Sequence, residues 1–282
     1  MKHIAVLGAG TMGTGIAHVA ALAGYQTNLV DSVADQLVKA KDRIAADLSV
    51  SVEKGKITDD EKGGALERLD TFTNLKDAVA RADLVIEAVP ERLELKIELL
   101  DAVCEAAPEQ HIFATNTSSL PVSEIASAHP VPSSVIGMHF FNPVHIMKLL
   151  EIVRAEQTSD DTLKTVQEVG QRMNRDMIVV RDAPGFATSR LGLVIGLEAM
   201  RMLESGVASA EDIDRAMELG YRHPMGPLRL TDLVGLDVRL AIAEHLHKEL
   251  GEAFRPPPIL RRMVRAGHLG KKSGRGFYNW SD

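Results

Sequence analysis

The sequence has little cysteine and few aromatic residues. Of its 282 residues only Cys104 is a cysteine, and aromatic residues make up 4%. One thiol excludes a disulfide within the chain and a metal site built from cysteines, and such a composition is typical of a reducing compartment. We therefore interpret Cys104 as a small apolar helix residue, and we predict no metal site.

Long apolar runs and an excess of positive charge are also lacking. The chain runs from Lys2 straight into a short apolar segment, without the features of a secretion signal or a membrane anchor. The formal net charge of -7 argues against nucleic acid or an acidic membrane as partner, although a local basic cluster could still hold a phosphate. We expect a cytoplasmic protein without nucleic-acid or membrane partners.

What the sequence does contain is an alternation of short apolar runs with helical patterns. Such alternation is typical of a doubly wound, mostly parallel sheet. Residues 34–69 are too long for one crossover helix, so we predict a projecting helical pair, with its turn at Gly55–Asp59 and Thr58 or Asp59 as the cap. The predicted strands are Ile4–Leu7, Thr27–Val30, Leu84–Ala88, Ile112–Thr115, Val135–Met138 and Leu149–Val153.

The pattern changes at Pro184 and Gly185, after which only helical signals follow. We predict one domain over residues 1–183 and a smaller all-α domain over 184–282. Apolar residues occur almost all round Leu191–Leu203, as in a helix buried in a core or at a subunit interface, and we expect a homodimer through this domain. The helical segments expected are Leu191–Leu203, Ala210–Leu219, Leu228–Leu250 and Ile259–Ala266.

A glycine-rich segment follows the first strand and opens a helix. Gly8 allows a tight turn, Gly10 lets the backbone approach a pyrophosphate, and Gly13 permits close packing. Asp31, at the end of the next strand, is placed to bind the ribose hydroxyls and to repel a 2′-phosphate, so the pattern predicts a Rossmann-type domain that binds NAD rather than NADP. The alternative is a turn that only packs, with Asp31 as a helix cap. The cofactor contacts predicted here are Gly8, Gly10, Thr11, Met12, Gly13 and Asp31.

One of the 10 histidines has the position of a catalytic base. His139 follows the apolar run Val135–Met138 near the carboxyl end of a strand, where open sheets bind their ligands. Glu151 lies beyond the break at Pro143 and can return to face the imidazole, where a carboxylate would fix its tautomer and stabilise the imidazolium. By position alone, His139 could equally be a structural histidine and Glu151 a surface charge.

Several segments, in order along nearly the whole chain, resemble the 3-hydroxyacyl-CoA dehydrogenase family in its bacterial short-chain form. The segment nearest to the family signature is GMHFFNPVHIMKLLE, at Gly137–Glu151. The others are VLGAGTMGTGIA at 6–17, IEAVPERLELK at 86–96, TNTSSLP at 115–121, APGFATSRL at 183–191, GYRHPMGPLRLTDLVGLD at 220–237 and KKSGRGFYNW at 271–280.

This resemblance implies an NAD-dependent oxidation of a 3-hydroxyacyl-CoA in fatty acid metabolism, as in β-oxidation. It makes His139 the base and Glu151 its partner, and it places Ser118 near both the substrate hydroxyl and the nicotinamide. The lysines could instead be solvated surface charges, and Ser118 a helix cap. The further contacts implied are Glu91, Asn142, Lys96 and Lys272 for NAD and Lys54 for CoA.

The sequence departs from the family at Ser189, where many relatives carry Asn. A serine hydroxyl still donates a hydrogen bond, so we expect Ser189 to contact the substrate with an altered preference and retained activity. Thr115 in place of a common Ser keeps a hydroxyl. We favour short acyl chains. Two alternatives stay open: a sugar-acid dehydrogenase of the gulonate type, which shares the His–Glu pair without CoA, and an NADH-binding protein without catalysis.

Overall fold

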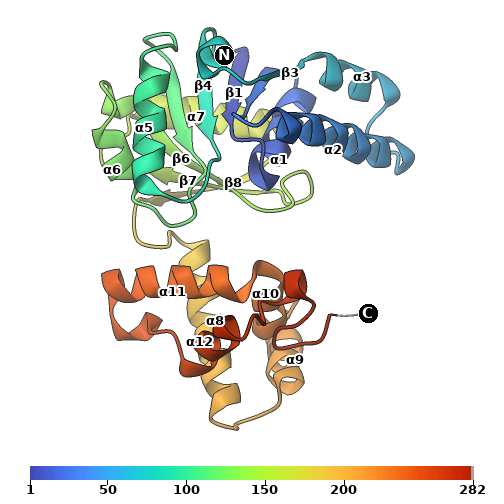
Figure 1. Cartoon of the computed structure of the whole chain (residues 1–282), viewed down its shortest axis with the longest axis vertical. Coiled ribbons are helices and arrows are strands. Elements are labelled where there is room, and N and C mark those ends of the chain that lie inside the picture. The colour runs from blue at the N-terminus through green and yellow to red at the C-terminus, as the bar shows by residue number, and fades with distance from the viewer. Residues whose placement is uncertain (281–282) are drawn as a thin grey trace. The chain divides into compact units, whose positions relative to one another are not determined.

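The computed structural model describes residues 1–280 (Figure 1). The chain divides into two compact units, Met1–Asp182 and Ala183–Asp282, and the division falls within one residue of the predicted boundary. We describe each unit by itself. Over the described range, none of the helices combines the length and the apolar character needed to cross a membrane.

The first unit is built on one sheet of eight strands in the order β3-β2-β1-β4-β5-β6-β7-β8. All neighbouring strands are parallel except β6 and β7, which are antiparallel. The chain reverses its order beside β1, and this is the point at which such sheets bind their ligands. The strands are β1 His3–Leu7, β2 Gln26–Val30, β3 Leu69–Phe72, β4 Leu84–Glu87, β5 Ile112–Thr115, β6 Val135–Phe140, β7 Leu149–Arg154 and β8 Asp176–Arg181.

All six predicted strands form, with their ends shifted by at most two residues. The prediction misses β3 and β8. In β3 only Leu69 is buried, so the strand has little hydrophobic contrast. β8 contains the apolar run Met177–Val180, a strand signal that the prediction omits, but it lies at the sheet edge with most side chains partly or fully exposed.

Helices cover both faces of the sheet. The main hydrophobic core joins α1, α2, α3 and α7 to one face. On the other face, Asn28 of β2 donates to Ala78 O of α4, and α6 packs on β6. The helices of this unit are α1 Thr11–Leu22, α2 Ala34–Glu53, α3 Asp59–Glu67, α4 Leu75–Val79, α5 Leu93–Cys104, α6 Val122–Ser127 and α7 Asp160–Arg172, with the 3₁₀ turn η1 Pro132–Ser134.

The predicted helical projection is confirmed as the pair α2 and α3 (Figure 1). Thr58 is the cap of α3. Its side chain accepts from the Glu61 backbone N–H, and the Glu61 carboxylate accepts from the Thr58 N–H at 2.7 Å. This capping box satisfies two backbone donors at the helix start and fixes the point where the chain turns back.

The second unit is helical, as predicted, but one helix was drawn too long. Leu228–Leu250 forms two helices, because Gly235 has φ +103°, which is incompatible with a continuous helix. The elements are α8 Thr188–Glu204, α9 Ala210–Gly220, α10 Pro227–Val234, α11 Leu236–Leu250 and α12 Pro258–Arg265, with the 3₁₀ turns η2 Glu252–Phe254 and η3 Lys271–Ser273.

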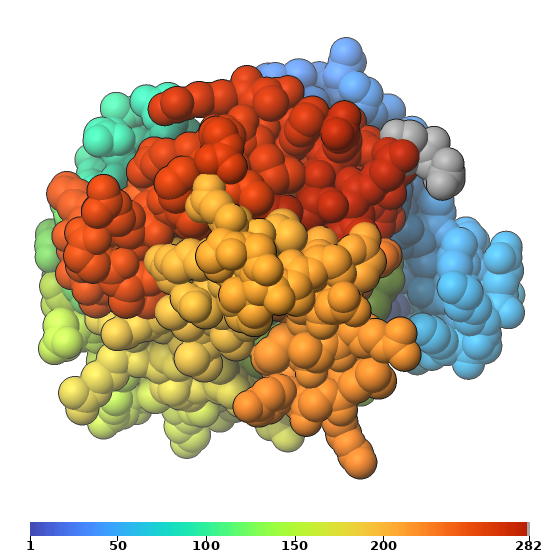
Figure 2. Space-filling view, turned by 90° about the horizontal axis from the view of Figure 1, so that it is seen from below, coloured from blue at the N-terminus to red at the C-terminus, as the bar shows by residue number. Residues whose placement is uncertain are grey.

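A buried carboxylate holds the C-terminal segment on this helical unit. Asp232 of α10 is 1% exposed and accepts from the Phe277 and Tyr278 backbone N–H groups and from Trp280 Nε1, each at 2.8 to 2.9 Å. Figure 2 looks onto this unit, coloured yellow through red. These hydrogen bonds to Asp232 therefore hold the C-terminal segment, which is too short to form a hydrophobic core of its own.

The helix α8 is not buried on every side within the single chain. Leu193 and Leu197 are fully buried, but Leu191 is 62% exposed and Ile195 is 36% exposed. Burial in the core of the single chain therefore does not account for the whole helix, and burial at a subunit interface stays a prediction. The interior of the helical unit accounts for only one face of α8.

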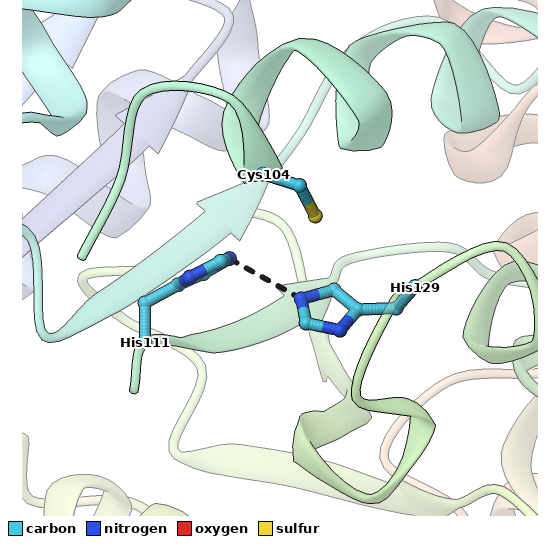
Figure 3. A group of neighbouring side chains, drawn as sticks. All are labelled: Cys104, His111 and His129. Atoms are coloured by element: carbon cyan, nitrogen blue, oxygen red, sulfur yellow. Dashed lines mark hydrogen bonds between the residues drawn. The ribbon is translucent and has the colours of Figure 1, made fainter. Parts of the chain in front are cut away.

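A chain of hydrogen bonds fixes two buried histidines in the first unit (Figure 3). His111 Nδ1 donates to Pro108 O at 2.8 Å, so His111 Nε2 carries no proton in the neutral ring. His129 Nδ1 accepts from the Val131 N–H at 2.9 Å, which leaves the proton on His129 Nε2, 3.4 Å from His111 Nε2. Both rings are therefore neutral donor–acceptor links, and burial lowers the pKa of each.

This histidine pair predicts a loss of stability in acid. Above the unfolded-state pKa of about 6.5 both states are neutral, whereas at lower pH the unfolded chain binds protons that the folded pair resists. The free energy of unfolding should fall as pH drops from about 7.5 to about 5.5. His129→Asn keeps an acceptor for Val131 but does not titrate, so urea unfolding should show a weaker pH dependence in this variant. An equal dependence would contradict the assignment.

Candidate active site

The glycine segment forms a tight loop between β1 and α1. Gly8 has φ +98°, a conformation that glycine adopts readily. A Cβ at Gly13 would lie 1.7 Å from Gly8 O, so α1 could not pack on the loop with any larger residue there. A Cβ at Gly10 would meet no atom within 4 Å. Gly10 therefore borders open space at the start of α1, where backbone N–H groups and the helix dipole attract anions.

Asp31 follows β2 and holds this loop. Its Oδ2 accepts from the Ala9 N–H at 2.8 Å, and its Oδ1 accepts from the Val33 N–H at 2.9 Å. Asp31 is not the cap of α2, whose N-cap is Val33 without a side-chain cap bond, but its carboxylate does have a local structural role in holding the loop. Each oxygen has a second lone pair, so the two N–H contacts do not prevent Asp31 from accepting from ribose hydroxyls.

A pocket of about 710 Å³ lies beside the loop and Asp31. Gly8, Gly10, Thr11, Met12 and Asp31, five of the residues predicted to contact the cofactor, are among those that line it. Its exposed lining is more apolar than polar, and it includes Leu75 and Val89. A pocket with apolar walls and a carboxylate at its rim suits an adenosine group.

The predicted catalytic pair is brought together by strand pairing. His139 and Glu151 face one another in the antiparallel register of β6 and β7, and His139 Nδ1 lies 2.9 Å from Glu151 Oε2. Glu151 is fully buried and His139 is 7% exposed, with the Phe141 ring centred 4.5 Å from its own. A carboxylate accepts only, so Nδ1 carries the proton and Nε2 is the basic nitrogen of the neutral ring.

Glu91, after β4, organises the loop that contains Ser118. Its Oε1 accepts from Thr117 Oγ1 at 2.6 Å, from the Ser118 N–H at 2.8 Å and from Ser118 Oγ at 3.2 Å. Burial alone would raise the pKa of Glu91, but the Lys96 ammonium and the bonds from Thr117 and Ser118 outweigh it and lower the pKa. Ser118 does not cap α6, whose N-cap is Pro121 without a side-chain bond.

Lys96 is not the solvated charge that was one alternative. It is 1% exposed, and its Nζ donates to both oxygens of the fully buried Glu87 at 2.7 and 2.8 Å. It also lies 3.3 Å from Glu91 Oε2. Thr115 Oγ1 donates to Glu87 Oε2 at 2.7 Å, so the hydroxyl at residue 115 helps to bind the buried Glu87 carboxylate. Lys96 therefore forms ion pairs with two carboxylates, at and just after the end of β4.

A second pocket, of about 510 Å³, opens on the other side of the glycine loop. Asn142, a predicted cofactor contact, lines it together with Gly10 and Thr11. His18 of α1 also lines it, and burial, reinforced by the neighbouring His145, lowers the pKa of His18 to about 4. Asn142 therefore lies close to the loop that Gly10 forms.

Three further contacts were predicted from the sequence, at Lys54, Ser189 and Lys272. Lys54 is exposed at the end of α2. Ser189, near the start of α8, and Lys272 belong to the helical unit, where Lys272 Nζ donates to Asp237 Oδ2 at 2.7 Å. Their roles stay predictions.

The sequence reasoning missed two residues that shape the site. Glu87 was not singled out, although an acidic residue at the end of an apolar run is unusual enough to be a signal. Asn116 Oδ1 accepts from the Phe140 N–H at 2.9 Å and ties the loop after β5 to the strand that contains His139. No local pattern marks Asn116, because its partner is distant in the sequence.

Asp31, the glycine loop, Glu87, Thr115 and His139 lie at or near the carboxyl ends of five adjacent strands, β2, β1, β4, β5 and β6. Residues 3–183 match the NAD binding domain of 3-hydroxyacyl-CoA dehydrogenase, and residues 185–280 match its C-terminal domain. This chain belongs to the 3-hydroxyacyl-CoA dehydrogenase family. The glycine loop, the open space at Gly10 and the pocket at Asp31 fit the cofactor of this family, which is NAD.

The chain is similar to several members of the family over its full length. It is 43% identical to a probable 3-hydroxybutyryl-CoA dehydrogenase of Bacillus subtilis, covering 100% of this chain and 98% of that protein. It is 40% identical to the mitochondrial hydroxyacyl-coenzyme A dehydrogenase of Sus scrofa, covering 99% and 91%. The crystal structure of (S)-3-hydroxybutyryl-CoA dehydrogenase from Ralstonia eutropha superposes with a TM-score of 0.96, at 39% identity and 100% coverage of both chains.

The buried ion pair of this dehydrogenase family member predicts a large effect of one substitution. Lys96→Met should lower the free energy of unfolding by about 3–5 kcal/mol, because it leaves the Glu87 carboxylate buried without a counter-charge. Lys76→Met is the matched control. The Lys76 side chain is 69% exposed, so this substitution should lower the free energy of unfolding by well under about 1 kcal/mol. Urea unfolding of both variants measures the difference. Similar values for the two would contradict the structural role of Lys96.

Proposed function

We propose that the chain catalyses the reversible NAD-dependent oxidation of short-chain (S)-3-hydroxyacyl-CoA, such as 3-hydroxybutyryl-CoA, to 3-ketoacyl-CoA. The observation that carries the proposal is the His139–Glu151 pair, 2.9 Å apart and buried at the carboxyl end of β6. The names of full-length relatives and the family match support the substrate class.

In this mechanism His139 Nε2 takes the proton of the substrate 3-hydroxyl. Nicotinamide, when bound, supplies the acceptor for the hydride that leaves carbon 3. The imidazolium formed on His139 is stabilised by the Glu151 carboxylate, which accepts the Nδ1 proton throughout and is not itself protonated. In the reverse direction the same imidazolium returns the proton to the forming alkoxide.

The other proposed contacts orient the two ligands. Ser118, held by Glu91, presents its hydroxyl near the reacting atoms, and Asn142 with the 91–96 segment contacts the nicotinamide half of NAD. Asp31 selects NAD over NADP by repelling a 2′-phosphate. From the helical unit we propose Ser189 for the substrate carbonyl and Lys272 for NAD. Lys54 at the end of α2 receives the CoA.

We further propose a homodimer, a cytoplasmic location and a role in β-oxidation. Leu191 and Ile195, exposed on α8, favour a partner on that face of the helix. A single cysteine suits a reducing compartment. The relative from Sus scrofa is mitochondrial by name, so the cytoplasmic location that we propose for this chain differs from the location of that relative.

The first test is loss of NADH absorbance with acetoacetyl-CoA. His139→Ala and Glu151→Gln should each lower turnover, by roughly 100-fold or more for His139→Ala, since a positioned acid–base group contributes about 10²–10⁴. NADH affinity, measured by fluorescence, should change little in both variants. NADH binding without consumption by the unmodified protein would favour the non-catalytic alternative, and unchanged turnover in Glu151→Gln would remove its assigned role.

The CoA part of the proposal is tested separately from the chemistry. Lys54→Glu should raise the KM for acetoacetyl-CoA and leave turnover at saturation nearly unchanged, because it places a negative charge beside the CoA phosphates. Lys164→Glu, on the exposed surface of α7, is the control for a change in net charge. Reduction of free acetoacetate or a sugar acid as fast as of the CoA ester would favour the gulonate-type alternative.

A further inference from the structure

Two histidines and an aspartate converge beside the second pocket. His18 comes from α1, Asp47 from α2 and His145 from the loop between β6 and β7. One potential ligand atom from each lies within 4.8 Å of the other two. We propose that His18, Asp47 and His145 form a binding site for a divalent transition metal ion of the Zn²⁺, Co²⁺ and Ni²⁺ class.

The distances are close to those of a coordinated ion. Zn–N and Zn–O bonds of about 2.0–2.2 Å hold tetrahedral ligand atoms roughly 3.3 Å apart. His145 Nδ1 lies 3.9 Å from Asp47 Oδ2, so these two need to approach by only roughly half an ångström. The ring centroids of His18 and His145 lie 5.4 Å apart, with 6° between the ring planes. Rotation of the imidazoles about their side-chain bonds would turn a nitrogen of each toward a shared ion.

His18 lies at the wall of this pocket. It is 3% exposed, and it is one of the residues that line the pocket. The pocket is therefore a route by which an ion could reach the His18 ring.

Arg43 orients the carboxylate for this role. Its Nε donates to Asp47 Oδ2 at 2.9 Å, while 69% of its side chain stays exposed. Such an outer contact fixes the direction of a ligating carboxylate and leaves the remaining lone pairs for the ion. Two imidazoles and one carboxylate suit Zn²⁺, Co²⁺ or Ni²⁺, whereas Mg²⁺ and Ca²⁺ prefer oxygen ligands alone.

A second cluster, Cys104, His111 and His129, also brings three potential ligand atoms within 4.8 Å (Figure 3). The sequence argument excluded a metal site built from cysteines, and it did not consider a site in which distant histidines join the one cysteine. The hydrogen bonds argue against an ion here. His129 Nδ1 accepts from the Val131 N–H, so a metal on Nε2 would require an imidazolate. His18 and His145 have no such constraint from a backbone N–H among the described residues.

An ion at the proposed site would connect the β6–β7 loop to α1 and α2. That loop includes Asn142 and joins the strands of His139 and Glu151. Binding to the folded state alone stabilises it in proportion to the logarithm of the ion concentration, so the melting temperature should rise with added metal.

The test uses CoCl₂ as the probe with the full-length chain. We expect saturable binding of one Co²⁺ per chain, seen by equilibrium dialysis and by visible absorption, without a near-ultraviolet band from sulfur. His145→Gln and His18→Gln should each weaken binding by at least about 100-fold, more than the loss of an outer contact costs. His145 lies on a loop, so its variant decides the matter if His18→Gln does not fold.

Cys104→Ser is the matched control and should bind Co²⁺ as the unmodified chain does. Three results would overturn the proposal. They are no saturable binding by the unmodified chain, binding in both histidine variants as tight as in the unmodified chain, or binding that disappears in Cys104→Ser. The last would assign the ion to the cluster of Figure 3 instead. None of these measurements depends on turnover, so the proposed dehydrogenase activity is tested separately.

Discussion

The antiparallel pairing of β6 and β7 is the constraint on which the site depends. The register places His139 opposite Glu151, so a ladder of backbone hydrogen bonds, rather than side-chain flexibility, sets their separation. A slip of β7 by one residue would turn Glu151 to the other face of the sheet, away from His139. The pair is also fully inside the sheet, with strands on both sides, and this rigidity is what a base needs to keep its tautomer.

Near this pair, an ion-pair and hydrogen-bond network runs along the ends of neighbouring strands. Lys96 pairs with Glu87 and Glu91, and Glu91 accepts hydrogen bonds from the loop that includes Ser118. Removing these charges from water is unfavourable, so the network adds little net stability. Its role is to position the site, because each carboxylate holds a backbone segment at the mouth of the site. Asp31 does the same for the glycine loop.

Much of this could be predicted from the sequence, because the signals are local. The glycine loop between β1 and α1 and the Thr58 cap act within short segments, and each forms as expected. Gly235 shows the limit of periodicity, since the apolar pattern continues across a residue whose φ ends the helix. The contact of Asn116 with Phe140 and the approach of His18 to His145 join distant segments, and no spacing rule in one sequence encodes them.

The three glycines of the loop answer to different demands. Gly13 has no room for a Cβ even in the protein without ligand, and Gly8 needs a backbone conformation that other residues adopt at a cost. Gly10 has neither restriction, since a methyl group there would touch nothing in the chain. Gly8 and Gly13 are thus required by the fold itself, whereas Gly10 is required by the nucleotide that the loop binds. A lineage that abandoned the nucleotide could lose Gly10 first and still keep its shape.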